Sequence, residues 1–278
     1  MRDITFGQYY PAQSVVHRLD ARSKMFLVVA YVVTIFFLVS FAGFGAIGLF
    51  VLLAVGLSKV PLGSVLRSIR PILYIMLFTV VLSVLLYKPV GGELPLVAWW
   101  RIGVYKTGLM QAGKMACRLV LLVVGPSLLT LTTTPTQLTD AMEWWLKPFA
   151  LIKLPVQELA LIMSIALRMI PTLIAETDKI VAAQKARCAN FDSKNLVKKA
   201  KSMLPVLIPL FVSSFNRADE LADAIDSRCY GYTKKRTKLK KPKFACRDLL
   251  AVLLFGVFGT FVLLVKFGWV PLFGWMYF

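Results

Sequence analysis

The chain has 278 residues, of which 58% are hydrophobic, and its mean hydropathy is +0.71. Soluble domains are usually about 45–50% apolar, so this composition excludes an ordinary soluble enzyme and a disordered chain. The 33 Lys and Arg exceed the 14 Asp and Glu and give a net charge of +19, which means that apolar mass and positive charge lie in different segments.

Five apolar runs in the sequence are candidates for crossing a bilayer, which takes about 20 apolar residues. In chain order they cover residues 25–42, 44–57, 72–87, 115–131 and 249–265. No polar loop separates the first two runs, which predicts a tight hairpin between them. The sequence therefore predicts an all-α, polytopic helical membrane protein with about five transmembrane helices.

The charges of the connecting segments predict the orientation. Most basic residues lie in residues 1–24, 58–71 and 132–247, which five spans place on one side. The excess of positive charge makes that side cytoplasmic. We therefore predict four segments: a cytoplasmic N-terminal segment (1–24), transmembrane helices 1–4 (25–132), a large cytoplasmic helical region (133–247), and the last transmembrane helix with an external C-terminus (248–278).

The cytoplasmic region is predicted to hold three helices. A threonine followed by a proline, Thr134-Pro135, is typical of a helix start. Asn190 is the expected left-handed residue after the second helix, and Pro171 an expected kink. The expected bounds are about 134–147, 155–189 and 195–230. The basic run 234–243 that follows is expected to contact anionic lipid rather than nucleic acid.

Catalytic and metal-binding motifs are missing from the sequence. Four distant cysteines without a CxxC pair, and a single histidine, exclude a zinc site, a disulfide framework and a multi-histidine site. Residues 108–114 match the spacing of a phosphate-binding loop, but Met115 stands where a Ser or Thr would bind magnesium. We therefore expect that this chain does not hydrolyse ATP itself.

Arg118 lies within the fourth predicted span, where a charge is costly. It could line a substrate or proton path, or it could bind a carbonyl or carboxylate as a structural partner. The structural alternative is favoured, because no Asp or Glu lies at the centre of a span to form a relay.

Two similar triplets stand at the ends of the last two cytoplasmic helices. They are Ala186-Arg187-Cys188 and Ser227-Arg228-Cys229, and in each an aromatic residue stands three positions after the cysteine. Small neighbours let a helix end approach another surface, and the guanidinium can bind a carboxylate with two hydrogen bonds. The two ends could enter two equivalent acidic grooves of a dimeric cytoplasmic partner. Alternatively, each arginine only complements the negative end of its own helix dipole.

The triplets and their surroundings resemble a known family, the transmembrane T component of energy-coupling factor (ECF) transporters of the ABC class. Residues 184–191 (QKARCANF) and 218–230 (ADELADAIDSRCY) are similar to its two Ala-Arg-Gly motifs, with Cys188 and Cys229 at the glycine positions and Ser227 at the second alanine. Residues 129–135 (LTLTTTP) resemble its threonine-rich exit from a span. The N-terminal residues that share the resemblance are Gly7, Gln8, Tyr9, Pro11, Ser14, His17, Arg18, Leu19, Asp20, Arg22 and Lys24, with Ala21 where proline is common.

The resemblance implies a non-catalytic scaffold in the bacterial plasma membrane. In that family the T component joins two ABC ATPase subunits to a small membrane protein, the S component, which captures a vitamin or metal. The site that would bind the ATPases is then Ala186, Arg187, Cys188, Ser227, Arg228 and Cys229. This chain would bind no cofactor, and the partners would use ATP and magnesium. The alternative is a secondary transporter or channel with a basic cytoplasmic domain, and an intramembrane enzyme lacks a catalytic constellation.

Overall fold

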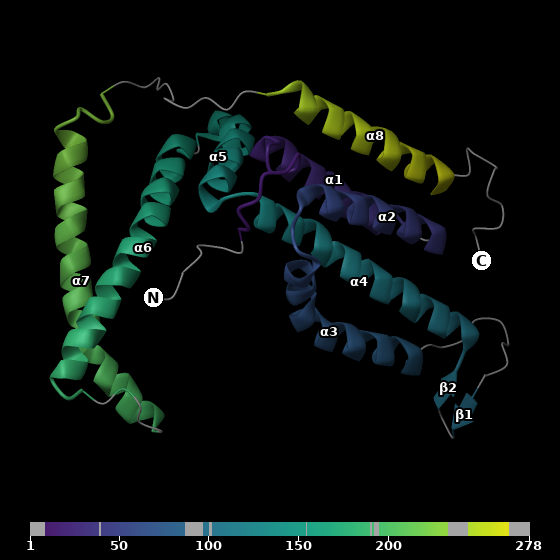
Figure 1. Ribbon diagram of the computed structural model, residues 1–278, viewed down its shortest axis with the longest axis horizontal. Coiled ribbons are helices and arrows are strands. Elements are labelled where there is room, and N and C mark those ends of the chain that lie inside the picture. The colour runs from purple at the N-terminus through teal and green to yellow at the C-terminus, as the bar shows by residue number, and fades with distance from the viewer. Residues whose placement is uncertain are drawn as a thin grey trace. The chain divides into compact units, whose positions relative to one another are not determined.

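The computed structural model describes residues 9–38, 40–86, 97–99, 102–153, 155–189, 191, 195–232 and 244–266. The chain divides into two compact units. The bundle unit comprises Thr5–Leu151 and Lys243–Phe278, and the helix-pair unit comprises Met1–Ile4 and Ile152–Pro242. Figure 1 shows the helices of both units.

The bundle unit is built around the long helix α4. Its helices are α1 (Ala21–Phe37), α2 (Phe41–Ser58), α3 (Leu62–Leu85), α4 (Lys106–Thr132), α5 (Pro135–Leu146), the short 3-10 helix Lys147–Ile152, and α8 (Cys246–Lys266). Helix α4 packs against α1, α2 and α3, and α1 also packs against α5 and α8 (Figure 1). The first and last helices of the chain therefore lie side by side.

Aliphatic and aromatic side chains from α1, α2, α4 and α8 form one buried cluster, in which Ile35 and Ile47 are completely inaccessible to solvent. The Tyr31 hydroxyl crosses from α1 to α4 and donates to the Leu121 carbonyl at 2.7 Å. Its ring lies against Gly125, where an added Cβ would overlap it. Burying this apolar surface fixes how α1 and α4 pack.

Among the described residues, four helices are long and apolar enough to cross a membrane: α2, α3, α4 and α6. The structure therefore confirms a polytopic helical membrane protein, and the predicted second, third and fourth spans are helical. Helices α1 and α8, which contain the other two predicted spans, are not among the four. Helix α6, expected in the cytoplasm, is a candidate by length and composition, so five spans stay a prediction.

The turn between α1 and α2 lies earlier than the sequence suggested. Helix α1 ends at Phe37 and α2 begins at Phe41, whereas the sequence put the turn at residues 41–45. Apolar content alone did not locate it, because the residues on both sides of the turn are equally apolar. The carbonyl of Leu38, just after α1, accepts a hydrogen bond from Arg118 at 2.6 Å.

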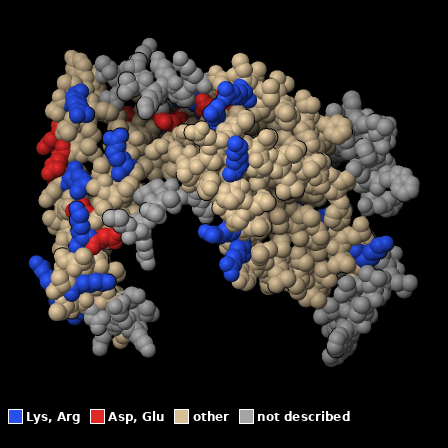
Figure 2. Space-filling model, in the orientation of Figure 1, with Lys and Arg blue, Asp and Glu red and all other residues tan. Residues whose placement is uncertain are grey.

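Positive charge gathers at one end of the bundle unit. This end holds the start of α1, the loop between α2 and α3, the end of α4 and the start of α8 (Figure 1). Figure 2 shows a smaller group of basic side chains at the opposite end and little charge on the visible surface between them. At the other end, β1 (Val97–Trp99) pairs antiparallel with β2 (Ile102–Val104). This hairpin was not anticipated in a chain expected to be all-α. The clustering agrees with placing these loops on one side of the membrane.

The helix-pair unit consists of α6 (Val156–Ala186) and α7 (Leu196–Asp226), which cross in Figure 1. The amide of Gln184 donates to the Pro205 carbonyl at 3.3 Å. Glu176 accepts hydrogen bonds from Ser213 and Arg217, and the ion pair with Arg217 is 3.0 Å long. These contacts hold the second half of α6 against the middle of α7, from Pro205 to Arg217.

Candidate functional site

The two triplets end their helices in the same conformation. Cys188 and Cys229 are left-handed, with φ angles of 62° and 53°. The Cys188 amide donates to the carbonyl three residues earlier at 3.0 Å, and the Cys229 amide does so at 2.8 Å. The next amides, of Ala189 and Tyr230, each reach back five residues, at 3.0 and 3.2 Å. Both ends are Schellman motifs, with the arginine just before the left-handed residue.

This geometry corrects three details of the predicted helix ends. Helix α6 ends at Ala186 rather than near Ala189, and α7 at Asp226 rather than near Tyr230. The left-handed residue after α6 is Cys188, whereas Asn190, predicted for that role, lies outside the described residues. Cysteine has a Cβ that disfavours positive φ, so residue type alone pointed to asparagine.

All six predicted site residues are exposed: Ala186, Arg187, Cys188, Ser227, Arg228 and Cys229. Within the described part of the chain, neither the Arg187 nor the Arg228 guanidinium has a hydrogen-bond or ion-pair partner, and neither donates to a carbonyl of its own helix end. An arginine whose only role was to complement its own helix would be expected to make such a contact.

The structure does not bring the two triplets together. Because Gln184 contacts Pro205, the end of α6 lies beside the first half of α7, and Arg228 lies beyond the far end of α7. A rise of 1.5 Å per residue separates the two arginines by roughly 30 Å. Figure 1 shows the two helix ends at opposite ends of the helix-pair unit. One groove cannot hold both triplets.

An exposed apolar stripe runs along α7 between the two triplets. Its side chains recur at helical spacing and are each at least 43% exposed: Leu204, Leu207, Ile208, Phe211, Val212 and Phe215. Helix α6 exposes a smaller set, namely Leu159, Ile162, Met163 and Ile170. Exposed apolar surface of this extent marks a membrane or protein contact.

Other candidates from the sequence have structural roles or fall outside the description. Residues 108–114, whose spacing resembles a phosphate-binding loop, lie inside α4, where the backbone amides form the hydrogen bonds of the helix. Arg118 binds the Leu38 carbonyl and lies over the Phe44 ring at 5.6 Å, so it is a structural partner of the α1 end. The basic run 234–243 lies outside the described residues.

A buried polar cluster at the charged end of the bundle unit was missed. Asp248 accepts from the amides of Asp20 at 2.7 Å and Ala245 at 2.9 Å and is only 3% exposed. The ammonium of Lys24 donates to the Thr132 carbonyl at 2.9 Å. The cluster thus joins the N-terminal segment to α4 and α8. The sequence feature that could have indicated this cluster is Asp248, a carboxylate directly before the last apolar run.

His17 organises the segment that precedes α1. Its Nε2 lies 3.0 Å from the Tyr10 carbonyl and therefore carries the proton, so Nδ1 accepts from the Ser14 hydroxyl at 2.7 Å. Burial lowers the pKa of His17, which favours this neutral form. The Tyr10 amide in turn donates to the Leu131 carbonyl at the end of α4. Among the described residues, no group of three His, Cys, Asp or Glu could hold a metal ion.

The chain is similar to known transporter proteins along nearly its whole length. The family described as cobalt transport protein matches residues 12–239. The chain is 45% identical over 269 residues to the energy-coupling factor transporter transmembrane protein EcfT of Clostridium kluyveri, covering 97% of this chain and 99% of that one. The EcfT proteins of Ruminiclostridium cellulolyticum and Bacillus subtilis are 44% and 41% identical, over 96% and 92% of this chain and 98% of each relative.

The family match over residues 12–239 includes both arginine triplets, and the three relatives align with 92–97% of this chain. The chain therefore belongs to the family of energy-coupling factor transporter transmembrane proteins.

Proposed function

We propose that this chain is the membrane scaffold through which two cytoplasmic ABC ATPases drive a substrate-capturing S component during vitamin or metal uptake. The observation that carries the proposal is the pair of matched helix ends, each presenting an exposed arginine without a partner among the described residues. Their separation of roughly 30 Å fits one groove on each of two ATPase subunits.

The arginine is suited to such a groove because its planar guanidinium can bind a carboxylate with two hydrogen bonds. The Schellman geometry ends the helix at once, so the arginine projects from the end of a rigid element. The charge around the two ends differs: Lys185 precedes Arg187, while Asp223 and Asp226 precede Arg228. The groove for α6 is therefore expected to be more acidic than the groove for α7.

The apolar stripe of α7 is the proposed contact for the S component. Its six residues lie on α7, which ends just before Arg228 and contacts the end of α6 through Gln184 and Pro205. A movement of either arginine end would therefore reach the helix that carries the S component. ATP and magnesium are bound by the ATPases in this scheme, and this chain supplies no catalytic residue.

The charged end of the bundle unit is proposed to face the cytoplasm, together with both arginine ends. An impermeant thiol reagent applied to intact cells should then leave Cys188, Cys229 and Cys246, all exposed, unlabelled. The same reagent should label them in inside-out vesicles. Labelling of any of the three from outside the cell would overturn the orientation.

The decisive experiment removes the two arginines. Arg187→Ala or Arg228→Ala alone should weaken the co-purification of the ATPases and lower vitamin uptake, because about 2–5 kcal/mol is lost when one partner of a buried charge pair is removed. The remaining end keeps the complex partly assembled, since two tethered contacts reinforce each other. The double variant should release both ATPases and abolish uptake driven by ATP.

Two controls separate this role from a general effect of charge. Arg67→Ala removes an exposed arginine from α3, away from both triplets, and should leave assembly and uptake unchanged. Lysine at either triplet keeps the charge but loses the planar group, and should restore little assembly. If the double variant retains its ATPases and full uptake, the arginines are simple helix-end charges.

A further inference from the structure

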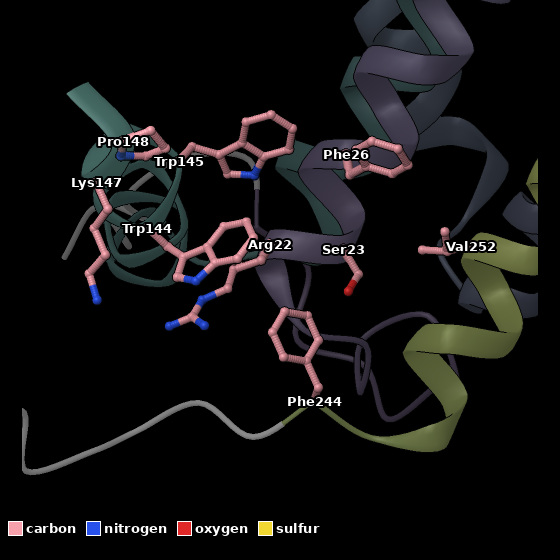
Figure 3. Close-up of a pocket in the computed structure, with 9 residues that line it drawn as sticks. All are labelled: Arg22, Ser23, Phe26, Trp144, Trp145, Lys147, Pro148, Phe244 and Val252. Atoms are coloured by element: carbon pink, nitrogen blue, oxygen red, sulfur yellow. The ribbon is translucent and has the colours of Figure 1, made fainter. Parts of the chain in front are cut away.

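The bundle unit contains a cavity of about 780 Å³ between the start of α1, the end of α5 and the start of α8. Its walls are largely aromatic, formed by the rings of Phe26, Trp144, Trp145 and Phe244 (Figure 3). The ring of Phe26 stacks on that of Trp145 with their centroids 6.1 Å apart. The resulting cavity is apolar and has room for a hydrocarbon chain.

Two cations line the same cavity, Arg22 and Lys147, and no carboxylate is among its lining residues. The guanidinium of Arg22 lies over the rings of Trp144 and Phe244, at 5.3 and 5.7 Å from their centroids. In Figure 3 the charged groups of Arg22 and Lys147 extend to the same side of Trp144. Within the described residues neither cation has an ion-pair partner, so an anion would complement both.

Two polar donors of the residues that line the cavity also lack acceptors within the described part of the chain. The indole nitrogen of Trp145 and Nε of Arg22 are both buried, and neither has a hydrogen-bond partner among the described residues. A buried donor without an acceptor leaves positive charge density uncompensated, which adds to the attraction of the two cations for an anion.

The cavity lies where two helices change from charged to apolar sequence. Helix α1 is polar up to Lys24 and apolar from Met25, and α8 changes in the same way after Asp248. The hydrogen bond from the Asp20 amide to Asp248 places these two changes from charged to apolar sequence side by side. In a membrane protein this level is the headgroup region, where tryptophan and basic side chains are favoured.

We propose that this cavity binds one anionic phospholipid, with its phosphate between Arg22 and Lys147 and an acyl chain against Trp145 and Phe26. The aromatic walls alone would accept any lipid, whereas the two unpaired cations select a net negative headgroup. A lipid held there contacts α1, α5 and α8 together, so it stabilises the charged end of the bundle.

The test uses the full complex in mild detergent, titrated with dioleoyl phosphatidylglycerol and followed by native mass spectrometry. One phosphatidylglycerol should bind per complex, at least tenfold more tightly than phosphatidylcholine with the same acyl chains. Arg22→Gln and Lys147→Gln should each weaken binding about fivefold, and the pair about thirtyfold, as expected for basic residues facing anionic lipid. Lys147→Arg should retain binding, which separates lost charge from misfolding.

Matched controls define what would overturn the proposal. The pair Arg67→Gln and Arg70→Gln removes two exposed cations of α3 outside the cavity and should leave binding unchanged. Brominated phosphatidylglycerol should quench tryptophan fluorescence, and Trp144→Phe with Trp145→Phe should remove most of that quenching. The proposal is overturned if the two lipids bind with equal affinity or if soluble glycerol phosphate displaces the bound lipid. It is also overturned if the cavity variants keep the lipid but lose a protein subunit.

Discussion

The ammonium of Lys24 donates to the backbone carbonyl of Thr132 at 2.9 Å and to the hydroxyl of Thr133 at 3.3 Å. This contact joins the first turn of α1 to the last residue of α4. Lys24 is only 5% exposed, and burial lowers its pKa to about 8 despite the opposing effect of Asp248 and Asp20. The N-terminal segment is therefore held in place by a cation that is costly to bury.

Because of this pKa shift, the stability of the protein is expected to rise with pH above about 8. Below that pH Lys24 is charged in both the folded and the unfolded states, so the cost of burying the charge is fully present. Between about 8 and the ordinary value of 10.5 the unfolded chain binds more protons than the folded one, so stability increases with pH. The thermal unfolding midpoint of the purified chain, followed from pH 7 to 10, measures this increase.

Lys24→Met should flatten that pH dependence, since the titrating group is gone. Lys106→Met, at an exposed position that starts α4, should leave the slope as in the unsubstituted protein. Equal slopes for Lys24→Met and the unsubstituted protein would show that Lys24 does not titrate in this range.

Gly125 is predicted to be essential for the packing of α1 on α4. A methyl group there would overlap the Tyr31 ring, which is held by its hydrogen bond to Leu121. Gly125→Ala should therefore destabilise the bundle by about 1–3 kcal/mol, as overpacking does. Gly113→Ala is the control on the same helix: its nearest neighbour would be Phe41 at 3.6 Å, an ordinary contact, so the gain in helix propensity should raise stability slightly. Thermal unfolding in detergent measures whether each variant raises or lowers the unfolding midpoint. A higher midpoint for Gly125→Ala would contradict the packing argument.

Local signals in the sequence predicted local structure well. Thr134 and Pro135 start α5 as expected, and Gln137 completes a capping box with Thr134. The Tyr31–Gly125 contact and the bond between Asp20 and Asp248 could not be read from the sequence, because each joins residues distant along the chain. Pattern analysis located the two arginines but not their geometry, since left-handed cysteines follow from the helix-end hydrogen bonds rather than from residue preference.

Arg118 is predicted to support the fold rather than a transport path. It caps the end of α1 through the Leu38 carbonyl, and Arg118→Met would leave that acceptor buried without its donor. The expected result is a lower unfolding midpoint, with uptake per correctly assembled complex unchanged. Uptake and midpoint should be measured on the same preparation. Normal stability with abolished uptake would instead place Arg118 on a substrate path.

The last prediction concerns the cysteines at the two helix ends. A left-handed conformation costs about 1–2 kcal/mol for a residue with a Cβ, and glycine avoids that cost. Cys188→Gly and Cys229→Gly should therefore each stabilise a helix end by about 1 kcal/mol, additively because the ends are far apart. The amides of Ala189 and Tyr230, which close the two Schellman motifs, report this as slower hydrogen exchange.

Two further variants test that reasoning: glycine at a cysteine inside a helix, and a bulkier residue at one of the two helix ends. Cys117→Gly lies in the interior of α4 at an exposed position, where glycine should destabilise the helix by about 1 kcal/mol. Cys188→Val places a β-branched residue at positive φ, so it should unwind the end of α6 and misdirect Arg187. ATPase co-purification should then fall with valine and persist with glycine. If valine retained the ATPases and glycine lost them, the left-handed turn would not be what orients the arginine.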